Sequence, residues 1–441
     1  MTASSLKQGE PVLPKGKSLM ETLPVTTAGV TSSIDNTKLN LLDTCFSAEN
    51  LHDAFMEIRG NIHFKYNVQN YRINELLEIS KFRTAYGDGT FAFSKSRPFR
   101  MRERGHERLI HPIVFRDRVV VHAFCKHVLI PKLTPYLIYD NCASLKGKGV
   151  DKAQDRFRVH LKRYFFRHKT NEGYILQIDC RKYFDNLRHD EIIRTIGEKL
   201  TEEELGFLKM ILKENEIDAS HMTENEREAC MNSVFNSLEY AAHHYPQTGE
   251  IMLEKSIGIG SEASQIIGLY YLHRIDNYIK IVKGFKEYAR YADDSYVISD
   301  SKQALKDLLE ELKIKYKEIG LEVSEKKTQI RKLNRPVTYL KVIYILTDTG
   351  KVIMRKHKDT FRWERVKLKK LARKLKDGKI TYKSVKNQYK GWRGTIMRRR
   401  KGTKVLVYKN LRQVRAMDKL YNELFIDPFI RGELNDMAGN S

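Results

Sequence analysis

The sequence predicts an α+β fold, in which helices pack on a small antiparallel sheet and a basic helical segment follows. Two stretches rich in β-branched and aromatic residues, Tyr288–Tyr291 and 295–299, flank a short acidic break, which is typical of a β-hairpin. Residues 116–133 and 302–319 instead repeat apolar residues at helical spacing. Between residues 351 and 401 the chain has 21 Lys and Arg but three acidic residues, on a segment with one apolar helical face.

Local signals predict the remaining elements. The apolar run at 174–178 is short enough for a strand, and it ends at Asp179. Turn-forming residues at 347–350 separate two further apolar runs. In chain order we expect a helix capped by Ser47, a helix at 116–133, a strand at 174–178, one helix at 261–282, the hairpin, a helix at 302–319, and strands at 339–346 and 351–354.

The chain divides into three segments by composition. Residues 1–47 are rich in Ser, Thr, Pro and Lys, which predicts an N-terminal arm without a core of its own. Residues 48–345 contain the predicted sheet and are interrupted at about 202–250 by a polar, acidic insertion. Residues 346–441 form the basic helical segment and a C-terminal tail.

The charge balance predicts a polyanionic partner. The 441 residues include 80 Lys and Arg against 55 Asp and Glu, a formal net charge of +25, so nucleic acid is the leading partner class. No apolar run approaches the ~18 residues of a spanning helix, so we expect no membrane partner and a cytoplasmic location. The five cysteines are scattered without paired spacing, which argues against disulfides or a zinc site.

Three carboxylates are candidates for metal binding. Asp293 and Asp294 are adjacent at the predicted hairpin turn, and hard divalent cations are a common reason to hold two carboxylates together. Asp179 supplies a third if its strand lies beside the hairpin in one sheet, and three converging carboxylates suit two-metal phosphoryl transfer. The alternative is a polar turn that contains two Asp, with Asp179 capping a strand end.

Seven ordered motifs resemble those of bacterial reverse transcriptases, the group that includes defence-associated and diversity-generating retroelement enzymes. The box Tyr-Ala-Asp-Asp at 291–294 resembles the family's catalytic box, and Asp-Cys-Arg-Lys-Tyr-Phe-Asp-Asn at 179–186 resembles its first aspartate motif. The other motifs lie at 115–120, 143–149, 258–265, 321–328 and 389–394. Together they cover about residues 48–425, and their order makes the resemblance far more specific than a single box.

The resemblance implies a right-hand polymerase, with fingers and palm at 48–345 and a helical thumb within 346–441. It implies an RNA-directed DNA polymerase that takes an RNA template and deoxynucleotides and makes DNA. Two Mg²⁺ ions per active site are expected, with Mn²⁺ as the alternative ion. The implied metal ligands are Asp179, Asp293, Asp294 and the backbone of Cys180.

Further site residues follow from the same motifs. Phe184 is expected to lie under the sugar of the incoming nucleotide and to exclude a 2′-hydroxyl, although the adjacent Tyr183 is the alternative ring. Ile259 and Gln265 depart from the family pattern of Gln and Pro, which predicts modest fidelity. The nucleotide pocket is expected to include Arg108, Phe184, Ile259, Gly260 and Gln265. The basic segment is expected to contact nucleic acid through Lys369, Lys370, Arg373, Lys374, Trp392 and Arg393.

The biological role is less determined than the chemistry. The insertion and the arm favour an enzyme that copies a dedicated non-coding RNA in anti-phage defence. The mutagenic polymerase of a diversity-generating retroelement is the alternative. More distant alternatives are an RNA-dependent RNA polymerase and a non-catalytic RNA-binding protein. The sequence does not name the template RNA or the priming mode, and a homo-oligomer stays open.

Overall fold

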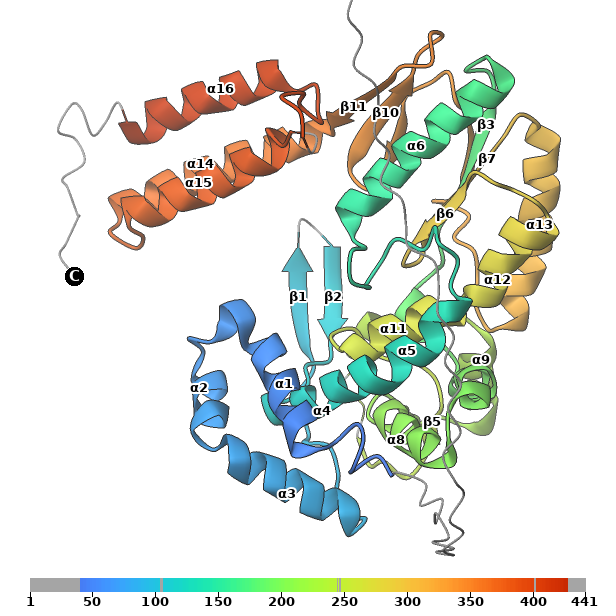
Figure 1. Cartoon of the computed structure of the whole chain (residues 1–441), viewed down its shortest axis with the longest axis vertical. Helices are drawn as coiled ribbons and strands as arrows, with labels where there is room; N and C mark the ends of the chain where they lie inside the picture. Colours follow the sequence, from blue (N-terminus) through green and yellow to red (C-terminus); the bar gives the residue numbers. More distant parts are fainter. Residues whose placement is uncertain (1–39, 104–105, 244, 246, 400–401, 427–441) are drawn as a thin grey trace, which may run out of the picture. The chain divides into compact units, whose positions relative to one another are not determined.

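The computed structural model describes residues 40–103, 106–243, 245, 247–399 and 402–426 (Figure 1). Most of the predicted N-terminal arm and the end of the predicted C-terminal tail therefore lie outside the described residues. Within the described ranges, no helix is long and apolar enough to cross a membrane.

The largest sheet among the described residues has four antiparallel strands. Its strand order is β6–β7–β3–β8, with β6 at Tyr288–Tyr291, β7 at Asp294–Ser299, β3 at Tyr174–Ile178 and β8 at Gln329–Lys332. The predicted hairpin is β6–β7, and the predicted strand 174–178 is β3. Ile178 pairs with Ser295, so the chain leaves β3 at Asp179 beside the start of β7. The register thus brings together two segments more than a hundred residues apart.

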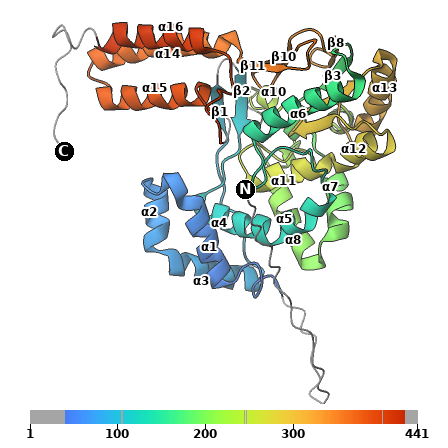
Figure 2. The ribbon, with the colours of Figure 1, turned by 45° about the horizontal axis from the view of Figure 1, so that its top comes forward.

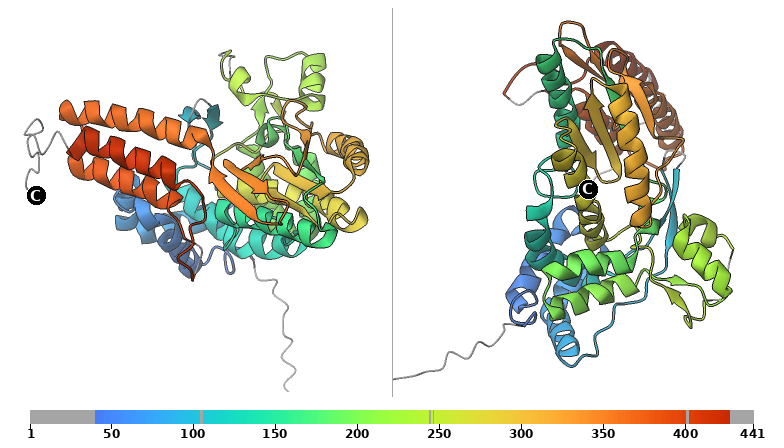
Figure 3. Two further views of the ribbon diagram at one scale, coloured as in Figure 1. Left: turned by 90° about the horizontal axis from the view of Figure 1, so that it is seen from above. Right: turned by 90° about the vertical axis from the view of Figure 1, so that its right-hand side faces the viewer.

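Helices cover both faces of this sheet, because successive strand side chains point to opposite faces. Ile175 and Tyr296 pack in one core cluster with α6 (Val150–His168), whereas Leu176 and Val297 pack in another with α13 (Lys302–Glu318). Figures 1 and 3 show both helices against the strands. Both helices are amphipathic, as their apolar spacing predicts.

Two predicted elements differ from the structure. The run 339–346 is not one strand, because Leu340 and Lys341 form a tight turn with positive φ between β9 (Val337–Tyr339) and β10 (Val342–Leu346). Such turns usually contain Asn or Gly, so this sequence does not signal one. The expected helix 261–282 is α11 (Glu262–Tyr271), α12 (His273–Asn277) and a π-helical turn. Arg290 donates to the Leu269 carbonyl near the break and competes with helical pairing there.

Most of the remaining elements before the C-terminal helices share the two core clusters of this sheet. The N-terminal helices and a two-stranded hairpin precede α6, and β10 pairs with β11 (Val352–Lys356) as well as β9. The elements not yet given are α1 (Ala48–Arg59), α2 (Tyr66–Ile73), α3 (Glu75–Gly87), β1 (Phe99–Glu103), β2 (His106–Ile110), α4 (Phe115–Phe124), α5 (Ile130–Leu133) and α7 (His189–Ile196).

The predicted insertion contains helices and a two-stranded sheet. Its elements are α8 (Glu202–Lys213), β4 (Ile217–Asp218), α9 (Glu224–Asn232), α10 (Ser237–Tyr240) and β5 (Met252–Leu253). Thr201 and Thr223 close capping boxes at the starts of α8 and α9, with Glu204 and Glu226 as the return partners. Residues between β4 and β5 pack around a small apolar cluster of their own.

The basic segment folds into three helices that lie side by side (Figure 2). They are α14 (Lys358–Lys376), α15 (Tyr382–Ile396) and α16 (Leu411–Tyr421), and we call them the C-terminal bundle. Their core includes Phe361, Leu368 and Leu371, the residues that predicted an apolar face. The basic side chains lie on the opposite surface of α14.

Candidate active site

The acidic turn between β6 and β7 is held by a buried arginine. Ala292 has φ 54°, in the left-handed region that a residue with a Cβ rarely adopts. Arg290 Nη1 donates to the Ala292 carbonyl over 2.8 Å, and its Nε and Nη2 bind both carboxylate oxygens of Asp276 on α12. Arg290 and Asp276 are both 0% exposed. The pair therefore fixes the backbone from which Asp293 and Asp294 project.

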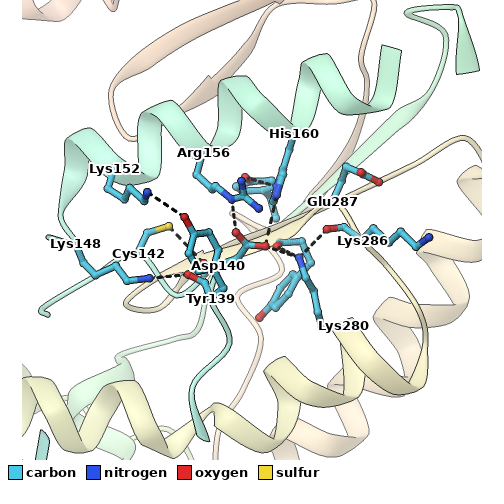
Figure 4. A network of polar contacts seen from close by, with 12 residues as sticks. Tyr139, Asp140, Cys142, Lys148, Lys152, Arg156, His160, Lys280, Lys286 and Glu287 are labelled. Carbon is cyan, nitrogen blue, oxygen red and sulfur yellow. Dashed lines mark hydrogen bonds and ion pairs between the residues drawn. The ribbon is translucent and has the colours of Figure 1, made fainter. Parts of the chain in front are cut away.

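A second polar network holds the outer edge of β6 (Figure 4). The Arg290 amide donates to the Asp140 carbonyl, and the Cys142 amide donates to the Arg290 carbonyl. The Asp140 carboxylate is bonded by Arg156 of α6 and by Lys280, while His160 lies 3.6 Å away. Burial would raise the pKa of Asp140, but these three cationic or polar neighbours outweigh it and hold that pKa well below its usual range.

The three predicted catalytic aspartates meet at one end of the sheet. Asp179 and Asp294 line one cavity of about 300 Å³ together with Lys327. Burial raises the pKa of Asp294 to about 7, and the charges of Asp293 and Asp179 add to the rise. Burial and the charge of Asp179 also raise the pKa of Asp293. The charge of Asp179 thus reaches both carboxylates of the acidic turn, across the end of the sheet.

Lys327 is the principal countercharge at this site. Its Nζ lies 3.1 Å from Oδ1 and 3.0 Å from Oδ2 of Asp179. Oδ2 is buried and accepts no hydrogen bond of good geometry, so this contact is a charge pair. Lys327 alone does not neutralise three carboxylates; Arg331 also lines the cavity, and the charge of Arg108 acts on Asp293.

The three aspartates are the right kind of ligand for a divalent cation, but their side chains are not placed to hold one. Asp179 is buried and Asp293 and Asp294 are half-buried; together they offer hard oxygen ligands, and Asp179 Oδ2 has no hydrogen bond. Among the described residues, however, no three His, Cys, Asp or Glu side chains stand close enough to hold a metal as placed. A bound cation would have to draw the carboxylates together and displace Lys327 from Asp179.

The predicted nucleotide-pocket residues are arranged around the loop before α11. Gly260 has φ 139°, and a Cβ there would lie 2.5 Å from the His111 carbonyl oxygen, so only glycine fits. The Ile259 carbonyl accepts from the His111 amide. Gln265 is exposed, and its Oε1 accepts from Ser144 Oγ over 2.9 Å. Gly260, Gln265 and Ser144 line a cavity of about 280 Å³ with Arg118.

Phe184 and Arg108 lie on elements other than those that carry the carboxylates. Phe184 lies in a 3₁₀ turn (Tyr183–Asn186) after β3 and is half-buried, whereas Tyr183 is 3% exposed and its hydroxyl donates to the Gly268 carbonyl. Arg108 is exposed on β2, where its charge acts to lower the pKa of Asp293 against the burial that raises it. Cys180 is buried and bridges to Val323.

The predicted nucleic-acid-binding residues fall into two groups. Lys369, Lys370, Arg373 and Lys374 are all exposed on α14. Trp392 is half-buried in the C-terminal bundle, stacked on Tyr389 at a centroid distance of 5.6 Å. Arg393 binds Asp418 with two hydrogen bonds of 2.8 and 3.2 Å. These two residues thus have structural partners, and only their exposed parts are available to a ligand.

Sequence reasoning missed the groups that position the site. Arg290 directly precedes the acidic box, and Lys327 lies in the quoted motif 321–328, but neither was assigned a role. Asp276 had no signal of its own, because its neighbours in α12 are mostly polar and a carboxylate there does not stand out. An Arg within a buried strand is the one clue available, because such a charge needs a buried partner.

Residues 126–344 match the family model for reverse transcriptase (RNA-dependent DNA polymerase). None of the curated proteins searched matches this sequence. Similar solved structures include apo telomerase from Candida tropicalis, with 14% identity, 81% of this chain and 63% of that chain covered, and a TM-score of 0.40. Telomerase from Candida albicans in complex with a TWJ fragment of telomeric RNA has 12% identity, covers 81% and 61%, and gives a TM-score of 0.43. The chain spans about three fifths of the length of these structures.

Proposed function

We propose that this chain, whose residues 126–344 form a reverse transcriptase domain, is an RNA-directed DNA polymerase that uses Asp179, Asp293 and Asp294 for catalysis. The family match and the antiparallel sheet with its helices confirm the predicted right-hand polymerase fold. The observation that carries the proposal for the site is the β3–β7 register, which brings Asp179 to the acidic turn.

The reaction joins a primer 3′-oxygen to the α-phosphorus of a deoxynucleotide. That bond forms as the bond to the β-phosphate's bridging oxygen breaks, pyrophosphate leaves, and the hydroxyl proton passes to solvent. Reverse transcriptases use divalent metal ions, and Mg²⁺ held by the three aspartates and the Cys180 carbonyl would activate the hydroxyl and neutralise the leaving group. The half-buried carboxylates of Asp293 and Asp294, whose pKa values are raised by desolvation and by the charge of Asp179, support this assignment.

Other residues of the chain would bind and select the nucleotide. Arg108 is free to reach a triphosphate, and its exposed guanidinium suits two-pronged phosphate binding. Phe184 is the better sugar-contacting ring, since Tyr183 is buried and its hydroxyl is already bonded. Gly260 lets the backbone approach closely, and Ile259 and Gln265 flank it. Exposed cations on α14 would follow the backbone of the primer–template duplex.

Replacing the aspartates tests the catalytic assignment. Asp293→Asn and Asp179→Asn should each lower primer extension at least about a hundredfold, because a lost metal ligand removes several kcal/mol of charge stabilisation. Asp300→Asn is the matched control, since Asp300 is exposed just beyond the far end of β7. Chelation should abolish extension and Mg²⁺ should restore it. Near-normal extension by Asp293→Asn would refute the assignment.

For the biological role, we propose cytoplasmic copying of a dedicated non-coding RNA in anti-phage defence. The insertion, with its own small core, supports a task beyond minimal template copying. Sequencing the nucleic acid bound to the purified protein should return one RNA species and its complementary DNA. Cells carrying Asp293→Asn should lose phage resistance. Resistance that survives this change would instead favour a non-catalytic RNA-binding role.

Ile259 and Gln265 support a second role, the mutagenic polymerase of a diversity-generating retroelement. Both residues lie at the predicted nucleotide pocket, and Gln265 is held by Ser144. A forward-mutation assay should then show frequent misincorporation, which Ile259→Gln reduces. Fidelity in the unmodified chain that equals or exceeds that of retroviral enzymes would refute this alternative. A preference for ribonucleotides over deoxynucleotides would instead indicate an RNA polymerase.

A further inference from the structure

The turn that carries Phe184 is held by hydrogen bonds from the insertion. Asn186 Oδ1 accepts from the Phe235 amide over 2.8 Å, and its Nδ2 donates to the Phe235 carbonyl over 3.0 Å. Asp185 accepts from both the amide and the hydroxyl of Ser237, at 3.1 and 3.0 Å. Asn186 is 1% exposed and Asp185 is 8% exposed. Two consecutive side chains of the turn are therefore committed to the segment 233–237.

That segment is itself held firmly. Lys255 is 0% exposed, and its Nζ donates to the carbonyls of Cys230, Met231 and Ser233 at 2.7–3.2 Å. These carbonyls end α9, where a cation also complements the helix dipole. Burying a lysine is costly unless its N–H donors are satisfied. The three hydrogen bonds therefore fix the segment after α9 in place. Phe235 packs in the insertion's apolar cluster.

The turn also packs closely against α11. A Cβ added at Gly268 would lie 3.2 Å from Phe184 Cε1. The Tyr183 hydroxyl donates to the Gly268 carbonyl, and the Phe184 carbonyl accepts from the Ile257 amide over 3.1 Å. The turn is therefore held by α11 beside the Phe184 ring and by the insertion at Asp185 and Asn186. A shift of the turn must move the ring relative to the sugar site.

We infer that the segment 233–237 of the insertion is a positioning element for nucleotide selection, which sets the depth of Phe184 through Asn186 and Asp185. The inference rests on the proposed role of Phe184 at the sugar of the incoming nucleotide. Asn186, Asp185 and Ser237 are positioning residues, which act on Phe184 through the turn. Loosening these hydrogen bonds lets the ring retreat and leaves room for a 2′-hydroxyl.

The test measures the ratio of kcat/KM for a deoxynucleotide to that for the matching ribonucleotide. Asn186→Ala and the milder Ser237→Ala should each lower the ratio, by up to about tenfold for a sub-ångström displacement. Ser237→Thr keeps the hydroxyl and should retain the selectivity for deoxynucleotides. Thr223→Ala is the matched control, because it removes a capping hydrogen bond from α9 of the same insertion without contact to the turn.

A second measurement does not depend on activity. Hydrogen exchange of residues 181–188 should accelerate in Ser237→Ala but stay unchanged in Thr223→Ala. Phe184→Ala tests the role of Phe184 at the sugar separately from the positioning role of segment 233–237. If Phe184→Ala lowers the ratio and neither Ser237→Ala nor Asn186→Ala does, the positioning role is refuted and the Phe184 assignment stands. If Phe184→Ala leaves the ratio unchanged, both are refuted.

Discussion

Two Arg–Asp pairs in this chain have nearly equal geometry, but one pair is buried and the other is exposed. Arg290 binds Asp276 behind the acidic turn, with Nε–Oδ1 and Nη2–Oδ2 distances of 2.8 and 2.6 Å and no exposure of either side chain. Arg393 binds Asp418 in the C-terminal bundle at 2.8 and 3.2 Å, with 44% and 32% of the side chains exposed. Their hydrogen bonds are alike, so burial is the variable that separates them.

Burial changes what each pair can do. An exposed pair is screened by water and salt and contributes about 0–1 kcal/mol. A buried pair gains little net stability, but removing one partner strands a charge in the core. Arg290 also holds the Ala292 carbonyl, so its position is linked to the acidic turn. We therefore expect the buried pair to position the site and the exposed pair to matter little.

The largest expected effect comes from breaking the buried pair. Asp276→Ala should lower the free energy of unfolding by about 3–5 kcal/mol, because Arg290 is left buried without a countercharge. Urea unfolding followed by circular dichroism measures this, with exposed Asp300→Ala as the control. A loss below about 1 kcal/mol would mean that water reaches Arg290 in the folded state, which would remove the contrast between the two pairs.

Replacing both partners separates stability from positioning. Asp276→Leu combined with Arg290→Met should return the unfolding free energy to within about 2 kcal/mol of the unmodified chain, since no charge remains buried. Primer extension should still be reduced about tenfold or more, because the Ala292 carbonyl loses its donor and the acidic turn can shift. Full activity in this double variant would show that the pair serves stability alone.

The exposed cations of the C-terminal bundle sharpen the comparison from the other side. Changing Lys369, Lys370, Arg373 and Lys374 to Gln should weaken primer–template binding and reduce the slope of log affinity against log salt by about 3. Fluorescence anisotropy across a salt series measures this. The matched control changes four exposed lysines of α13 to Gln, namely Lys302, Lys306, Lys313 and Lys317. An equal reduction in that control would mean that net charge, not the α14 surface, determines binding.

The smallest effect is expected from the exposed pair itself. Asp418→Asn keeps the acceptor for the Tyr389 hydroxyl and should change the free energy of unfolding by less than about 1 kcal/mol. The change should shrink further at high salt, where exposed charges are screened. Unfolding at two salt concentrations measures both. A salt-independent loss above about 2 kcal/mol would place this pair with the buried one.

Much of the site was predictable because its signals are local. The acidic box, the strand before Asp179 and the amphipathic helices each show their pattern within a few residues, and these elements form as expected. The strand that is split into β9 and β10, and the helix that is broken into α11 and α12, have causes that the sequence pattern does not show. A turn without Asn or Gly, and a carbonyl taken by a distant arginine, have no signature in hydrophobic periodicity.

Residue identity and spacing along the chain were enough to predict three candidate carboxylates and to locate a basic surface on α14. The pairs that hold them in place were decided only in the folded molecule: Arg290 with Asp276, Lys327 with Asp179, and Asn186 with Phe235. Each joins segments whose separation bears no relation to helical or strand periodicity. Packing selects these partners, because a buried polar group must find whichever partner the tertiary fold brings within reach.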